Sequence, residues 1–545
     1  MTELLRIENL TVDLPPGADR PHALKDVSLA VHAGEIVCVV GESGSGKSLT
    51  AGTILGLLPQ GVRASGGRVL WEGQDLLTLA PEALRRLRGQ RIGMIFQEPM
   101  TALNPLRTIG DQIAEVFRTH TRLSRAEIRR RTLDLLESVR IPDPAQAVEA
   151  YPHELSGGQR QRAMIAMALA LEPALLIADE PTTALDVTTQ AQILHLIHDL
   201  QRRKGTAVLF ITHDFGVVAE IADRVAVMQR GELVESGTAG QVLEHPRHPY
   251  TRALIAAVPP LAPAAARASL DAAAPAILTT QGLSKTYRKR GWLGRPGRVT
   301  HAVDGVTLAL PQGGTLGIVG ESGSGKSTLA RTLLGLLPPD NGSITLAGAP
   351  LAFKGAAARR THARRVQMVF QDPYGSLNPR QRVGEIVAQG PIVHGTPRRA
   401  AWARAQELFE LVGLSPDAVR RYPHEFSGGQ RQRVGLARAL AMNPQVLIAD
   451  EPVSALDVSV QAQVLALLGR LREQLGLSIV FITHDLRVAA QVCDHIAVMK
   501  QGRVVEEGAC AEVFGNPVHP YTRALLAAVP GRRWDPAAVA TRLAA

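Results

Sequence analysis

Two glycine-rich segments carry the residue types that proteins use to hold phosphate groups. GESGSGKS begins at Gly41 and again at Gly320, each time after an apolar run and before a helical pattern. Glycines let backbone amides converge on phosphate oxygens, and the start of a helix adds positive potential. Lys47 and Lys326 add a full charge, and the serine that follows each lysine can hold Mg²⁺. The sequence therefore predicts two phosphate-binding loops.

Each loop is followed, further along the chain, by an apolar run that ends in two adjacent acids. These acids are Asp179-Glu180 and Asp450-Glu451. Neighbouring side chains at the end of a strand diverge, so one carboxylate can engage Mg²⁺ while the next polarises an attacking water. Two such acids are weak evidence by themselves. Together with a phosphate-binding loop they indicate a site that hydrolyses a nucleotide.

A second anion-binding helix start accompanies each pair of acids. SGGQ begins at Ser156 and at Ser427 and opens a helical pattern, so its hydroxyl and glycine amides can bind a phosphate group. One domain rarely needs two such helix starts for one nucleotide. A histidine follows a later apolar run in both places, as His213 and His484.

These motifs recur because the chain contains two tandem copies of one sequence unit. YPHELSGGQRQR at Tyr151 returns as YPHEFSGGQRQR at Tyr422, an offset of 422 − 151 = 271 residues, and the IADEP, FITHD and HPYTRAL segments keep the same offset. A tandem duplication of this kind predicts two similar domains. The expected parts are a first domain at residues 1–259, an Ala/Pro-rich linker at 260–276, a second domain at 277–530 and a tail at 531–545.

Short apolar runs must position these motifs. Residues 36–40, 175–178 and 208–211 each precede a glycine-rich or polar loop, a pattern typical of a mostly parallel sheet covered on both faces. The segment before the first SGGQ is helical, and Ser124 with Glu127 fits a capping box there. We therefore expect an α/β fold in each copy.

The composition places the chain among globular proteins and argues against several functions. Of its 545 residues, 45% are hydrophobic and 20% are charged. No apolar run approaches the roughly 20 residues that cross a bilayer, and residues 1–10 lack a secretory signal, so we expect the chain in the cytoplasm. The net charge is +10. Of the 60 basic residues 8 are lysine, which leaves 60 − 8 = 52 arginines. These arginines are scattered through both halves, which favours a bias in composition over a basic surface that binds nucleic acid. Cys38, Cys493 and Cys510 show no CxxC spacing, so we expect no zinc site and no disulfide.

The full set of motifs resembles that of the ATP-binding cassette ATPases. The set adds Gln97 or Gln371, and an aspartate in ALDV at Asp186 or Asp457, to the loops, acids and histidines above, and it covers nearly the whole chain twice. The resemblance implies two tandem P-loop cassettes, each a mostly parallel sheet with a helical subdomain. It further implies an intramolecular head-to-tail pseudo-dimer in which the phosphate loop of one cassette faces the SGGQ segment of the other.

The resemblance also assigns roles, with ATP and Mg²⁺ as cofactors. Glu180 and Glu451 match the general base, and His213 and His484 match the residue that contacts the γ-phosphate. The residues expected to bind ATP are Gly41, Glu42, Ser43, Gly44, Ser45, Gly46, Lys47, Ser48, Gln97, Ser156, Gly157, Gly158, Gln159 and Asp186 in the first copy, and Tyr287, Gly320, Glu321, Ser322, Gly323, Ser324, Gly325, Lys326, Ser327, Thr328, Gln371, Ser427, Gly428, Gly429, Gln430 and Asp457 in the second. The expected Mg²⁺ ligands are Ser48, Gln97, Asp179, Ser327, Gln371 and Asp450.

The two copies differ where cassettes place an aromatic ring on adenine. That position holds Tyr287 in the second copy and Leu14 in the first. An aromatic face contributes about 1 to 3 kcal/mol per stacked base in other base-binding proteins, and leucine offers only apolar contact. The resemblance therefore predicts unequal adenine binding at the two sites.

Finer features resemble one branch of the family. QEPMTALNP from Gln97, QDPYGSLNP from Gln371 and both HPYTRAL segments look like those of oligopeptide, dipeptide and nickel importers, and two fused cassettes look like glutathione and microcin C type peptide importers. The partners implied are two integral-membrane permease subunits and an external substrate-binding protein, with no nucleic acid, and the location is the inner face of the cell membrane. Because no cysteine follows either HPYTRAL segment, we predict no iron–sulfur cluster.

One alternative is a soluble tandem-cassette ATPase that acts on ribosomes or nucleic acid. Such a protein is expected to have a long, charged, helical linker between its cassettes, whereas residues 260–275 are short and rich in Ala and Pro. The transported solute stays open, because selectivity is expected to reside in the permeases and the binding protein.

Overall fold

Buried apolar runs form the central sheet of the first copy. Residues of β3 (Ile36–Val40), β7 (Leu175–Asp179) and β8 (Ala207–Ile211) are buried at every position, as suits aliphatic strands covered on both faces. The strand order is β10 (Glu232–Thr238), β9 (Arg224–Gln229), β3, β8, β7 and β6 (Ile92–Ile95). All neighbours are parallel except β10 and β9. The predicted mostly parallel sheet is confirmed.

The second copy repeats this sheet strand for strand. Its order is β16 (Val366–Val369), β17 (Val446–Asp450), β18 (Ser478–Thr483), β13 (Thr315–Val319), β19 (His495–Lys500) and β20 (Arg503–Ala509), again with one antiparallel pair at the β20 edge. β13 lies between β18 and β19, as β3 lies between β8 and β9. The two phosphate loops therefore leave equivalent central strands.

Each copy also has an antiparallel sheet that the sequence did not predict. Its order is β2 (His22–His32), β1 (Glu3–Asp13), β4 (Arg63–Trp71) and β5 (Gln74–Asp75) in the first copy, and β12 (Val299–Pro311), β11 (Ala276–Arg288), β14 (Asn341–Leu346) and β15 (Ala349–Pro350) in the second. Leu5, Ile7, Leu10 and Val12 of β1 join the buried core of the first copy. Register shifts along β1 break the simple alternation that marks a strand in a sequence.

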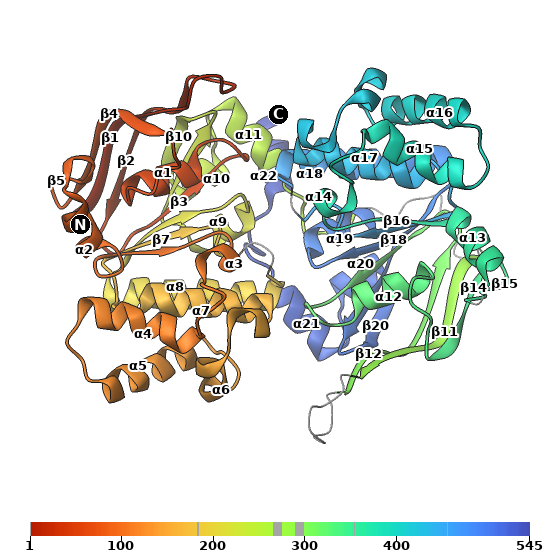
Figure 1. The fold of residues 1–545 in the computed structure, drawn as a ribbon, viewed down its shortest axis with the longest axis horizontal. Helices are drawn as coiled ribbons and strands as arrows, with labels where there is room; N and C mark the ends of the chain where they lie inside the picture. The colour runs from red at the N-terminus through yellow and green to blue at the C-terminus, as the bar shows by residue number, and fades with distance from the viewer. Residues whose placement is uncertain are drawn as a thin grey trace. The chain divides into compact units, whose positions relative to one another are not determined.

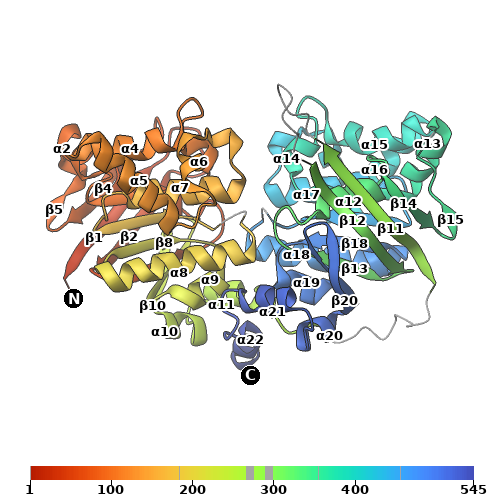
Figure 2. The ribbon, with the colours of Figure 1, turned by 90° about the horizontal axis from the view of Figure 1, so that it is seen from below.

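The helical subdomain of each copy contains the helix that SGGQ opens. In the first copy α4 (Ile109–His120), α5 (Arg125–Ser138) and α6 (Pro144–Glu149) pack on one another, and α4 and α5 also pack on α7 (Gly157–Leu169) (Figure 1). In the second copy α15 (Val383–Val393) and α16 (Arg398–Leu411) pack on α17 (Gly428–Leu440) (Figure 2). At α5 the Ser124 hydroxyl accepts from the N–H of Glu127 at 3.3 Å, while the Glu127 carboxylate pairs with Arg130 and Arg131.

The remaining helices of the two copies and the tail have the following bounds. In the first copy they are α1 (Lys47–Ile54), η1 (Leu76–Thr78), α2 (Pro81–Leu87), α3 (Pro99–Ala102), η2 (Pro152–Glu154), α8 (Val187–Lys204), α9 (Phe215–Ile221), α10 (Ala239–Glu244) and α11 (Pro249–Ala256). In the second copy and the tail they are α12 (Lys326–Leu333), α13 (Ala356–Arg365), α14 (Pro373–Ser376), η3 (Pro416–Arg420), η4 (Pro423–Glu425), α18 (Val458–Leu475), α19 (Leu486–Val492), α20 (Cys510–Gly515), α21 (Pro520–Ala527) and α22 (Pro536–Ala544).

This computed structural model describes residues 2–182, 185–264, 275–288, 299–353, 355–454 and 456–544. Part of the predicted linker, residues 265–274, lies outside the described residues. The chain forms two compact units: Met1–Val258 together with Val529–Ala545, and Pro259–Ala528. Over the described ranges, no helix has the length and apolar character needed to cross a membrane.

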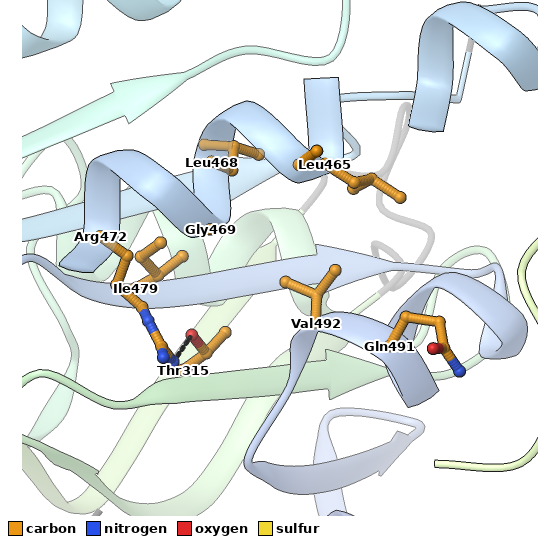
Figure 3. A pocket seen from close by; sticks show the side chains of 9 residues that line it. Thr315, Leu465, Leu468, Gly469, Arg472, Ile479, Gln491 and Val492 are labelled. Atoms are coloured by element: carbon orange, nitrogen blue, oxygen red, sulfur yellow. Dashed lines mark hydrogen bonds between the residues drawn. The ribbon is translucent and has the colours of Figure 1, made fainter. Parts of the chain in front are cut away.

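A buried arginine ties α18 to the central sheet of the second unit. Arg472 donates to the Thr315 hydroxyl at 3.3 Å (Figure 3). It also donates to Asp494 at 2.9 Å. A cavity of about 230 Å³ lies beside it, between α18 and α19. Gln491 stands at the edge of this cavity, on the far side from Arg472 (Figure 3).

Candidate active site

Glycines shape each phosphate-binding loop because backbone passes close to them. In the first copy a Cβ at Gly41 would clash with the carbonyl oxygen of Met228, and Gly46 caps α1 with a φ of 105°. In the second copy Gly325 has a φ of 107° and lies against the Ala302 carbonyl. Only glycine adopts such backbone without strain. The loop thus curls tightly between a buried strand and the start of a helix.

The loop lysines reach back into this curl. Lys47 donates to the carbonyl oxygens of Gly41 at 2.7 Å and Glu42 at 2.9 Å, and it is 6% exposed. Lys326 makes the same two bonds in the second copy, at 2.6 Å and 2.8 Å. Each ammonium group is therefore held against the first two residues of its own loop.

The first acid of each pair lies against the serine of the loop. Ser48 donates to Asp179 at 3.0 Å, and Asp179 is 6% exposed. Burial raises the pKa of Asp179 to about 6, against the hydrogen bond from Ser48. Burial and the charge of Glu451 likewise raise the pKa of Asp450 to about 6. The Oδ1 atom of Asp450 is buried and has no hydrogen-bond partner among the described residues, which suits a carboxylate that holds a cation.

The second acid of the first copy is held by side chains from two other segments. Gln97 donates to Glu180 at 3.0 Å, and the Nδ1 atom of His213 lies 3.2 Å from its other carboxylate oxygen. Glu180 has a φ of 47°, a conformation rare for residues other than glycine, and its N–H donates to Ile211 at 2.9 Å. The strained backbone turns this carboxylate toward the glutamine and the histidine.

The second copy repeats this arrangement with matching distances. Gln371 donates to Glu451 at 2.6 Å, His484 lies 3.2 Å from the same carboxyl group, and Glu451 has a φ of 47°. Burial raises the pKa of Glu451, but the hydrogen bond and charge of His484 outweigh it, so the pKa lies below its usual range. Burial lowers the pKa of His484, and Glu451 more than offsets this, so the pKa of His484 is raised. The pair therefore favours a carboxylate beside an imidazolium.

The SGGQ segments are preformed helix starts. Ser156 accepts from the N–H of Gln159 at 3.3 Å, and the Gln159 side chain accepts from the N–H of Ser156 at 2.9 Å. Ser427 and Gln430 make the same reciprocal bonds, at 3.3 Å and 3.0 Å. Among the described residues of the first unit, no hydrogen bond joins Ser156 to the cluster around Glu180. Asp186 caps α8 by accepting from the N–H of Thr189 at 2.9 Å, and Asp457 stands at the start of α18.

The structure adds a contact that the sequence motifs did not predict. The hydroxyl of Tyr250, in the first HPYTRAL segment, accepts from the N–H of Glu42 at 3.1 Å. Tyr521 of the second segment accepts from the N–H of Glu321, also at 3.1 Å. These tyrosines lie about 200 residues from the loops they contact, so only the repetition of HPYTRAL at the common offset marked them in the sequence. Each brings a C-terminal helix, α11 or α21, to a phosphate loop.

The two copies differ beside the loop, where the sequence predicts the adenine platform. Tyr287 at the end of β11 is 42% exposed, whereas Leu14 packs against the core of the first copy. Arg20, also missed from the sequence, donates to the Gly44 carbonyl at 2.5 Å. The roles of all these residues in binding and catalysis stay predictions.

Comparison with known proteins places these features in a family. Residues 24–183 and 303–454 match the ABC transporter family, and residues 234–297 and 505–539 match the C-terminal region of oligopeptide/dipeptide transporters.

Three relatives extend the similarity over nearly the whole chain. The chain is 49% identical to the peptidoglycan transport ATP-binding protein YejF of Agrobacterium fabrum, over 96% of this chain and 96% of that protein. It is 47% identical to the glutathione import ATP-binding protein GsiA of Pectobacterium atrosepticum, over 97% of this chain and 89% of that protein. It is 46% identical to GsiA of Escherichia coli K12, over the same shares. The chain therefore belongs to the ABC transporter family and is an ATP-binding ATPase with two cassettes.

Proposed function

We propose that this chain is the ATP-hydrolysing subunit of a bacterial ABC importer for peptides or related solutes. The observation that carries the proposal is that both copies pair a histidine with a glutamate beside a phosphate-binding loop and both continue into a segment matching the C-terminal region of oligopeptide/dipeptide transporters. The names of the relatives, which concern peptidoglycan transport and glutathione import, support a small peptide-containing solute.

The residues of the second cluster suit the hydrolytic step. The pKa of Glu451 lies below its usual range, so the side chain is a carboxylate at neutral pH and can accept a proton from a water. Gln371 and His484 orient that carboxylate from two sides. Lys326 and the loop amides would bind the phosphates. The first cluster offers the same groups.

The donor set also fits Mg²⁺. Asp450 and Ser327 would hold the ion in the second copy, as Asp179 and Ser48 would in the first, because hard oxygen ligands beside a phosphate site suit Mg²⁺. When bound, Mg²⁺ would neutralise charge on the phosphate oxygens. Gln97 and Gln371, expected as further ligands, donate to the glutamates through their amide nitrogens, and the role of their amide oxygens at the ion stays a prediction.

The partners follow from the proposed import. Two integral-membrane permease subunits would carry the solute and an external binding protein would deliver it. Binding to these permeases would hold the chain at the inner face of the cell membrane.

The test is to produce the chain with the permeases and binding protein encoded beside it and to reconstitute the complex in vesicles. We expect ATP-dependent uptake of at least one member of a panel of dipeptides, glutathione and peptidoglycan peptides. We also expect uptake to be lost in the Glu180→Gln, Glu451→Gln double variant. Purification with ribosomes, and without any permease, would instead support the soluble tandem-cassette alternative.

A further inference from the structure

The end of each sequence copy belongs to the compact unit that the other copy forms. The first copy ends at Pro259, where the second unit begins, and the equivalent position in the second copy is 259 + 271 = 530, within the segment Val529–Ala545 that belongs to the first unit. The two terminal segments are therefore exchanged. Each packs beside the helix that follows a site histidine, either α9 or α19.

The C-terminal segment packs on α9 and α11 of the first unit. The N–H of Gly531 donates to Glu220 of α9 at 3.1 Å. Trp534 is 9% exposed and stacks on Phe215 of α9, with ring centroids 6.4 Å apart. Beyond it, α22 packs on α11 (Figure 1 and Figure 2). This segment thus has apolar burial as well as polar contacts.

The start of the linker packs on α19 of the second unit in the same way. Gln491 donates to the carbonyl oxygens of Pro260 at 2.9 Å and Ala262 at 2.8 Å. The N–H of Ala264 donates to the carbonyl of Ala490 at 3.0 Å. Gln491 is the residue at the edge of the α18–α19 cavity (Figure 3). The linker is therefore anchored up to residue 264.

The polar contacts are matched at equivalent positions. Gly531 corresponds to Pro260, and Glu220 corresponds to Gln491, since both pairs differ by 271 residues. Gly531 has a backbone N–H, and this group donates to the carboxylate of Glu220. Pro260 has no N–H, and its carbonyl oxygen accepts from the side-chain amide of Gln491. A carboxylate in place of Gln491 would face two carbonyl oxygens without a donor.

Steric fit also distinguishes α9 from α19 as the helix that can receive the C-terminal segment. Gly216 of α9 lies so close to the tail that a Cβ there would come within 2.8 Å of the Pro530 carbonyl oxygen. The equivalent residue of α19 is Arg487, which donates to Pro259 at 3.4 Å. The C-terminal segment needs a glycine in the helix that receives it, and α19 lacks one there. Steric fit thus favours packing of the C-terminal segment on α9 over packing on α19 of its own copy.

We propose that the exchanged segments hold the two halves of the chain together as a specific pair without nucleotide. The N-terminal half of the chain contributes residues 259–264, which pack on α19, and the C-terminal half contributes Val529–Ala545, which pack on α9 and α11. The pairing rests on the Gly531–Glu220 and Gln491–Pro260 contacts and on Trp534. It does not depend on the solute or on ATP turnover.

The test cuts the linker and asks whether the halves stay together. A protease recognition sequence is inserted between residues 265 and 274, and the purified full chain is stripped of nucleotide and Mg²⁺ and then cleaved. We expect the halves to co-elute in size-exclusion chromatography. Gln491→Glu combined with Trp534→Ala should weaken the pair at least tenfold. The matched control combines Gln491→Lys, which keeps a donor, with the exposed Arg532→Ala, and it should behave as wild type.

Two results would overturn the proposal. One is separation of the wild-type halves after cleavage. The other is co-elution of the Gln491→Glu, Trp534→Ala halves with unchanged affinity, because the halves would then associate through other surfaces. Melting curves of the uncut variants show whether each has folded. Where the double variant has not folded, Gln491→Glu alone is compared with Gln491→Lys, and equal affinities of those two would overturn the proposal as well.

Discussion

Removing the hydroxyl of Tyr521 should weaken nucleotide binding at the second site. The hydroxyl accepts from the N–H of Glu321, the second residue of the phosphate loop, at 3.1 Å. Lys500 lies over the Tyr521 ring, 4.6 Å from its centroid. Phenylalanine keeps the ring, so Tyr521→Phe removes the hydroxyl and with it this hydrogen bond.

The size of the effect follows from the position of the bond. A neutral hydrogen bond contributes about 0.5 to 1.5 kcal/mol, and more when its loss leaves a buried donor unpaired. The Glu321 N–H is adjacent to Gly320, and Lys326 donates to the carbonyls of both residues. A loop that relaxes at Glu321 also moves its lysine. Since about 1.4 kcal/mol is a factor of ten, we expect the Kd for ATP at site two to rise roughly threefold to tenfold.

The assay is a site-resolved titration with a fluorescent ATP analogue. Tyr250→Phe should give the same loss at site one, because its hydroxyl accepts from Glu42 at 3.1 Å. The control is Tyr374→Phe, since Tyr374 is 65% exposed. Turnover at saturating ATP should change less than the Kd. Wild-type affinity in both variants, or an equal loss in the Tyr374 control, would refute a bracing role for these hydroxyls.

Three further outcomes can be measured on the same material. Glu180→Gln with Glu451→Gln should lower ATP hydrolysis by about 10² to 10⁴ while ATP still binds, and wild-type turnover would show that the base is wrongly assigned. Because burial raises the pKa of Asp450 to about 6, the nucleotide-free protein holds a proton that the unfolded chain releases above about pH 4. Its stability relative to Asp450→Asn should therefore fall as the pH rises through 6, whereas Mg²⁺-dependent ATP binding should weaken below pH 6; flat profiles in calorimetry and titration would contradict this. Tyr287→Ala should weaken ATP binding at site two about tenfold or more and Leu14→Tyr should tighten site one, and equal, unchanged affinities would exclude the asymmetry.

The central sheets were predictable because their strands are continuous buried runs. The run at residues 36–40 became β3 with the expected bounds, and β7 and β8 differ from the expected runs by one residue each. The antiparallel sheets were missed because β1 and β11 carry register shifts. At such shifts the alternation of inward and outward side chains slips.

The clusters around the glutamates were predictable in composition but not in geometry. Motif spacing marked Glu180, Gln97 and His213, and the structure brings their side chains together. The left-handed backbone at Glu180 carries no sequence signal, because that conformation normally marks glycine or asparagine. The Tyr250 contact was hidden because tertiary folding alone joins segments that are 208 residues apart.

The two copies can be compared with each other, and positions at the nucleotide sites then differ in behaviour from positions at the exchanged segments. The phosphate-loop segment GESGSGKS, the glutamines, the Asp-Glu pairs, SGGQ and the histidines are identical in both copies, as are the tyrosines that reach the loops. Positions at the exchanged segments differ, and they differ in pairs: Glu220 meets an N–H, and Gln491 meets the carbonyl of a proline. Drift in one copy alone would leave one partner of such a pair unmatched. The complementary change on both sides of each contact is the reason to infer that the exchange itself, and not only the sites, constrains this sequence.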